Sequence, residues 1–131
     1  METKQVIVLR KDLKMRKGKM IAQGAHASMK VILDVMYYHT GENCIKLLDM
    51  TECEPLYQWV NGLFTKIVVG CNSEEELLAL KEKADEAKIL NALIQDAGKT
   101  EFHGMKTYTA LAIGPDWVDR INEITGHLQL L

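Results

Sequence analysis

The hydrophobic pattern of the chain alternates between two periodicities. Short runs rich in β-branched residues predict strands that are buried on both faces, because strands covered by helices on each side need no polar alternation. Four such runs occur, at Gln5–Arg10, Thr65–Val69, Leu90–Ile94 and Tyr108–Ile113. Between most of them apolar residues recur every three or four positions, which predicts helices.

The longest predicted helix runs from Gly18 to about Tyr38. We expect its core-facing stripe to be the apolar set at helical spacing, which comprises Ala22, Ala25, Met29, Ile32 and Met36. A second helix is expected from Asn72 and Ser73 to about Lys88, since three glutamates after these capping residues favour a helix start.

Two further segments have weaker helical signals. Pro55 and the apolar residues after it suggest a short helix within the otherwise unreadable Cys44–Trp59 segment. The Gly114-Pro115-Asp116 sequence ends the fourth strand, and a last helix is expected over Trp117–Ile124. Its expected N-cap is Asp116, and Gly126 is expected to adopt the left-handed conformation after its end.

These elements predict one α/β domain over residues 1–131, with a mixed, mostly parallel four-stranded sheet and helices on both faces. The last two strands are joined without a helix, so the fourth strand should be antiparallel. Ligands of open α/β sheets bind beyond the carboxyl ends of the parallel strands. We therefore expect the loop after the first strand and the Gln95–Thr100 loop to lie on the same rim.

Charge is segregated along the chain although the net charge is only −2. Residues 1–30 contain eight Lys or Arg and two acids, and six of the ten residues from Arg10 to Lys19 are basic. Such a cluster fits either a solvated loop or a surface that contacts anions or nucleic acid.

Other functional classes find little support in the sequence. Apolar runs stay well below the roughly 18 residues that a membrane span needs. The three cysteines have neither CxxC spacing nor an even number, so we expect no disulfide framework and no zinc site. A reducing cytoplasm is the expected compartment, with no metal and no cofactor.

Candidate chemistry begins on the first helix, where Lys19, Gln23, His26 and Lys30 form one polar stripe. The stripe starts at the predicted binding rim, where a helix N-terminus favours a phosphate or an oxyanion. A solvated helix face would explain the two lysines equally well. A lone helical histidine is also typical of a packing residue.

The facing loop contributes Asp96 and Thr100. Asp96 could orient or deprotonate a water molecule that the Thr100 hydroxyl holds. The alternative is an Asx turn in which Asp96 bonds the backbone near Gly98. A phosphate-binding P-loop is excluded, because it needs a glycine five positions before Gly98 and Leu93 stands there.

Four blocks of this sequence resemble the type 2 peptidyl-tRNA hydrolases, in the order in which that family carries them. They are Gly18-Lys19-x-x-Ala22-Gln23-x-x-His26-Ala27 after the basic Leu9–Met15 segment, Gln95-Asp96-Ala97-Gly98-Lys99-Thr100, Ala112-Ile113-Gly114-Pro115, and Thr125-Gly126-His127-Leu128. The resemblance covers essentially the whole chain.

This resemblance implies hydrolysis of the ester of peptidyl-tRNA, which releases tRNA and peptide, on a mixed four-stranded sheet flanked by helices. The implied active-site positions are Lys19, Gln23, His26, Asp96 and Thr100. Within the basic loop, Lys14, Arg16 and Lys17 then face the tRNA. Which residue acts as the base stays open, since Asp96 could be a proton acceptor or the partner of Lys19.

The sequence departs from the family pattern at two places, and a third segment is unusual. Phe102-His103-Gly104-Met105-Lys106 replaces a Pro-Gly-Ser stretch, and Gly24-Ala25 replaces a cluster of small residues. The Tyr37–Trp59 segment is long and apolar, as in an interface or a divergent lid, and the sequence leaves a homodimer open. The alternative function is an inactive paralogue that binds RNA or protein.

Overall fold

The computed structural model of the protein describes residues 1–38, 46–98 and 102–131. Four helices and six strands occur in these ranges. In chain order they are β1 (Thr3–Arg10), α1 (Lys17–Val35), β2 (Tyr37–Tyr38), β3 (Lys46–Leu47), α2 (Glu54–Asn61), β4 (Lys66–Cys71), α3 (Glu74–Glu86), β5 (Asn91–Asp96), β6 (Thr107–Trp117) and α4 (Val118–Thr125).

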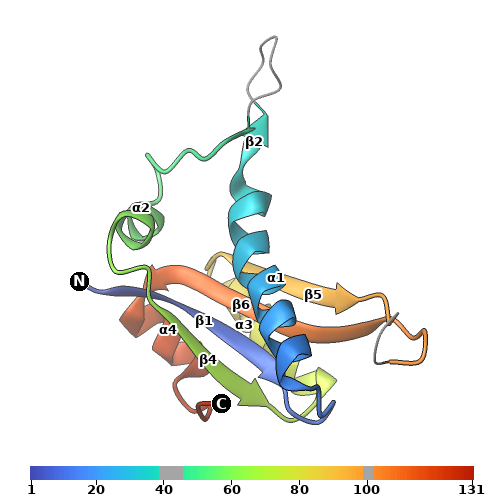
Figure 1. Ribbon diagram of the computed structural model, residues 1–131. Coiled ribbons are helices and arrows are strands. Elements are labelled where there is room, and N and C mark those ends of the chain that lie inside the picture. The colour runs from blue at the N-terminus through green and yellow to red at the C-terminus, as the bar shows by residue number, and fades with distance from the viewer. Residues whose placement is uncertain (39–45, 99–101) are drawn as a thin grey trace.

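The main sheet has the strand order β4-β1-β6-β5, and β2 pairs with β3 in a separate ribbon. Only β1 and β4 pair in parallel, because β6 lies antiparallel between β1 and β5. The predicted mostly parallel sheet is therefore wrong at the level of hydrogen-bonded pairs among the described strands. The directions of β1, β4 and β5 nevertheless agree, so their carboxyl ends share one edge of the sheet (Figure 1).

Helices cover both faces of this sheet, as the sequence predicts (Figure 1). Alternate residues of β1 point to opposite faces, so Val6 and Val8 pack toward α3 and α4 while Ile7 and Leu9 pack toward α1. Two apolar layers result, one on each side of the sheet. Both contain side chains from β1 and β6, which are the two central strands.

The face that α1 presents to the sheet differs from the predicted stripe. Its buried residues are Gln23, Gly24, Ala27 and Val31, whereas Met29 is 56% exposed. Small residues allow the helix to approach the sheet closely, and the buried polar residue is satisfied by a hydrogen bond. The predicted core stripe is therefore wrong, and the helix also ends at Val35 rather than near Tyr38.

The start of α3 agrees with the prediction, since the Ser73 side chain accepts a hydrogen bond from the Glu76 N–H. The expected short helix after Pro55 is present as α2. The start and end of the last helix differ from expectation. Trp117 rather than Asp116 occupies the N-cap of α4, and Gly126 has an ordinary φ of −62°.

The longer β6 explains the error at the start of α4. Strand pairing continues through Gly114-Pro115 to Trp117, which pairs with Thr3 of β1. The Asp116 carboxylate accepts instead from the Trp117 N–H and from Arg120, one turn along the helix.

Candidate active site

Two side chains that lie 77 positions apart in the sequence meet where β5 ends and α1 begins. Lys19 belongs to the first turn of α1, and Asp96 is the last residue of β5. The Lys19 Nζ lies 2.9 Å from the Asp96 Oδ1, and the two side chains are only 13% and 15% exposed. The two loops that follow β1 and β5 thus share one rim, as predicted from the sequence.

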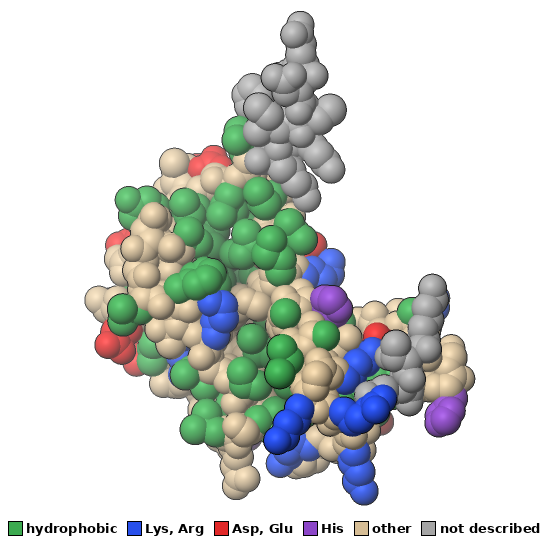
Figure 2. Space-filling view, in the orientation of Figure 1, with side chains coloured by type: hydrophobic (Ala, Val, Ile, Leu, Met, Phe, Trp, Pro, Cys, Tyr) green, Lys and Arg blue, Asp and Glu red, His purple; other side chains and the backbone are tan. Residues whose placement is uncertain are grey.

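The start of α1 adds a positive field to this rim. Arg16 is the N-cap in extended conformation, and the first turn has neither a side-chain cap nor an acidic residue. The partial positive charge of a helix N-terminus favours anions, and it adds to the charge of Lys19. Lys14, Arg16 and Lys17 are exposed beside it, and Figure 2 shows Lys and Arg side chains gathered at this end of the molecule.

Asp96 has a partner on each carboxylate oxygen. Its Oδ1 accepts from Lys19, and its Oδ2 accepts from the Gly98 N–H at 2.9 Å. The hydrogen bond from Lys19 is the main cause that holds the pKa of Asp96 below its ordinary value, and the Gly98 N–H and the charges of Lys19 and His26 add to it against desolvation. The ion pair and the Asx turn proposed as alternatives therefore coexist in one residue.

Gly98 enables this arrangement because it has a φ of +81°, which side chains other than glycine rarely adopt. A Cβ at this position would collide with the backbone of Met105. The turn is braced further by the Gly104 N–H, which donates to the Gly98 carbonyl at 2.9 Å. The carboxylate of Asp96 is consequently held by a turn with little steric freedom.

Gln23 lies on the buried side of the predicted polar stripe. It is 2% exposed, and its Oε1 accepts from the Thr109 Oγ1 at 2.5 Å. Sequence reasoning missed Thr109, which is a fully buried member of β6. The available signal was a hydroxyl within an otherwise apolar strand, since buried polar groups usually pair.

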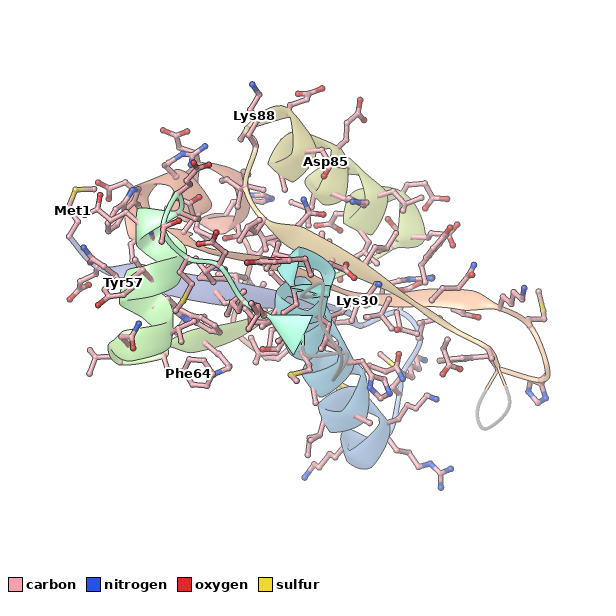
Figure 3. All side chains as sticks on the ribbon, turned by 90° about the horizontal axis from the view of Figure 1, so that it is seen from above. Met1, Lys30, Tyr57, Phe64, Asp85 and Lys88 are labelled. Atoms are coloured by element: carbon pink, nitrogen blue, oxygen red, sulfur yellow. The ribbon has the colours of Figure 1, made fainter. Side chains whose placement is uncertain are left out.

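The remaining predicted residues occupy different settings. His26 is exposed, and it lies near enough to Asp96 for its charge to favour the carboxylate form. Lys30 (Figure 3) pairs with Asp34 at 3.1 Å on the exposed surface, which fits the solvated-face alternative. Thr100 falls outside the described residues.

No group of three or more His, Cys, Asp or Glu residues in the described ranges could hold a metal ion. Over the same ranges, no helix is both long and apolar enough to cross a bilayer. The chemistry that this rim can offer from its own residues is thus electrostatic: one cation, one fixed anion and the positive end of a helix.

Comparison with known proteins agrees with this picture. The chain is 42% identical to a peptidyl-tRNA hydrolase of Sulfurisphaera tokodaii, with all of both chains covered. It is 39% identical to a peptidyl-tRNA hydrolase of Methanocaldococcus jannaschii, with 98% of this chain and 99% of the relative covered. A protein of unknown function from Agrobacterium tumefaciens shares the fold, with a TM-score of 0.59 and 12% identity over 100% of this chain and 98% of that one. Residues 3–131 match the family described as peptidyl-tRNA hydrolase PTH2, and the chain belongs to that family.

Proposed function

We propose that this protein hydrolyses the ester that joins a peptide to the 3′ ribose of tRNA, releasing free tRNA and peptide. The observation that carries the proposal is the half-hidden ion pair of Lys19 and Asp96 at the basic rim. An ester substrate with a polyanionic leaving group needs a cation at the carbonyl and a positive surface for the phosphates. Both lie at the start of α1, and the relatives are named peptidyl-tRNA hydrolases.

In the proposed reaction, water attacks the ester carbonyl and negative charge develops on the carbonyl oxygen. Lys19 and the N-terminus of α1 stabilise this oxyanion, since prearranged donors act most strongly where charge appears in the transition state. Collapse of the tetrahedral intermediate breaks the bond to the ribose oxygen. That oxygen takes up a proton and leaves as the 3′ hydroxyl of tRNA.

Asp96 orients the attacking water and Lys19 in this scheme, rather than storing its proton. Two hydrogen bonds hold the carboxylate in its anionic form, and a base with a lowered pKa has little driving force to accept a proton near neutral pH. Thr100 follows Asp96 in the same loop, and we assign its hydroxyl to the same water.

The other predicted residues position the substrate. Lys14, Arg16 and Lys17 contact phosphates of the tRNA from the exposed rim. Gln23 is held by Thr109 behind the site, and we assign it with His26 to holding the 3′ nucleotide or the orientation of Lys19. Because its substrate arises during translation, we expect the protein to act in the cytoplasm.

One assay separates this proposal from an inactive paralogue that only binds RNA or protein. Purified protein is incubated with N-acetyl-aminoacyl-tRNA and with the same tRNA that carries an unblocked amino acid. We expect cleavage of the blocked ester only. Cleavage of neither ester, with RNA binding retained, would support the binding module instead.

A further inference from the structure

An aromatic side chain lies beside the proposed catalytic pair. The Lys19 Nζ is 5.6 Å from the centroid of the Phe102 ring, which is half-buried at the turn between β5 and β6. Phe102 opens the short stretch in which the sequence departs from its family pattern. The hydrolytic scheme above gives this ring no role.

The backbone that carries Phe102 is braced to the turn that holds Asp96. Its carbonyl accepts from the Met105 N–H at 2.9 Å, while Gly104 bonds the Gly98 carbonyl on the β5 side of the same turn. An aromatic side chain also has few rotatable bonds to immobilise. The ring is therefore presented next to Lys19 at small entropic cost to a ligand.

The substrate has an aromatic group at a matching place. The ester oxygen and the base belong to the same ribose, so a base lies only a few covalent bonds from the carbonyl that Lys19 contacts. Every tRNA ends in adenosine, whereas the side chain of the last amino acid varies among substrates. An aromatic side chain suits a planar base, because every base has a π-face on which to stack.

We propose that the Phe102 ring stacks on the 3′-terminal adenine of the tRNA while Lys19 contacts the ester. This inference rests on the proposed hydrolysis and adds a specificity-determining residue to it. The effect is on binding of the terminal nucleotide, so it should appear in KM more than in kcat. The competing ligand for the same ring is an apolar side chain of the peptide.

The test compares Phe102→Leu and Phe102→Tyr with the wild-type enzyme. Phe64→Leu is the matched control, because the Phe64 ring also contacts a lysine, with the Lys66 Nζ 3.2 Å from its centroid. Phe64 follows α2, on the side of the molecule away from the β5–β6 turn (Figure 3). The substrates are N-acetyl-leucyl-tRNA and N-acetyl-glycyl-tRNA, each with adenine or with no base on the terminal ribose.

We expect Phe102→Leu to raise KM for both adenine-bearing substrates by roughly 5- to 150-fold, as for removal of one base-stacking interaction. Phe102→Tyr and Phe64→Leu should stay near wild type, and the base-free substrates should not respond to Phe102→Leu. An equal loss on base-free substrates, a loss confined to the leucyl ester, or an unchanged KM would each overturn the inference. In all three cases the wild-type enzyme still cleaves its substrate, whereas a wild-type enzyme that cleaves neither refutes the hydrolytic function itself.

Discussion

Replacing Asp96 by Asn tests whether the ion pair acts as one catalytic unit. Asn keeps the size of Asp and one acceptor oxygen, so it can still accept from Lys19, but its amide nitrogen cannot accept from the Gly98 N–H. The substitution therefore removes a charge and leaves one backbone donor without its partner. Hydrogen bonds to charged groups contribute about 1.5–3 kcal/mol, so we expect a measurable loss of stability but a folded protein.

The expected loss of activity is larger than this structural cost. If the carboxylate orients the water and Lys19, the single-turnover rate on N-acetyl-aminoacyl-tRNA should fall by roughly 10²- to 10⁴-fold while tRNA binding survives. Asp34→Asn is the matched control, since its pair with Lys30 on the same helix is 47% and 48% exposed. That pair should matter little to either rate or stability.

A double variant that adds Lys19→Met decides whether the two residues act together. If they form a unit, the double variant should be about as slow as the slower single variant. Near-normal turnover in Asp96→Asn would return Asp96 to its turn-forming role. Fully additive losses would show that the two side chains act independently, which would refute the catalytic pairing.

The lowered pKa of Asp96 also predicts a pH dependence of stability. A carboxylate whose pKa is depressed in the folded state stabilises that state above the ordinary value of 3.8, and this contribution is lost as the pH falls through the lower folded pKa. Acid titration of unfolding should therefore show a smaller loss of stability below pH 3.8 in Asp96→Asn than in wild type. Identical acid profiles would contradict the cause assigned to the shift.

Four further outcomes follow from the site. Gly98→Ala should cost about 1–3 kcal/mol in denaturant unfolding and reduce turnover, because the positive φ and the collision with Met105 displace the turn. Thr109→Val should cost about 1–3 kcal/mol, since the buried Gln23 oxygen loses its donor, whereas an unchanged midpoint would mean that Gln23 finds another partner. His26→Ala should slow hydrolysis less than Lys19→Ala, and the reverse ranking with a rate pKa near about 6.5 would identify histidine as the acid or base. Neutralising the three exposed cations of the rim should make the slope of log affinity against log salt shallower by roughly 0.7–0.9 for each phosphate that they neutralise in the wild type, and an unchanged slope would assign the tRNA to another surface; these cations are Lys14, Arg16 and Lys17.

The location of the site could be predicted from the sequence because strand direction needs little tertiary information. β-branched runs separated by helices fixed the directions of β1, β4 and β5, and loops at their carboxyl ends must then share an edge. Lys19 and Asp96 follow from that rule together with the family resemblance. The role of Thr109 could not be predicted, because a single buried hydroxyl acquires meaning only from the residue that faces it across the fold.

The buried face of α1 was mispredicted for a related reason. Periodicity identifies which side chains share a face, but the neighbouring surface decides which face is buried. Here the sheet accepts the face with Gly24 and Ala27, where a Cβ at Gly24 would lie 3.6 Å from the Ile7 side chain. Large apolar residues such as Ile21, which is 72% exposed, are left outside.

The same displacement of α1 explains how the catalytic pair can form. Because β6 lies between β1 and β5, a helix centred over β1 and β4 would leave Lys19 far from the end of β5. Instead α1 packs against β5, β6 and β1, which brings its first turn to Asp96. The cost of this placement is an uncovered strip of the sheet, where Val68 of β4 is 37% exposed beside an apolar cavity of about 430 Å³. The exposed apolar surface along α1 is thus the geometric counterpart of the site, since one helix cannot both cover the β4 edge and present Lys19 to Asp96.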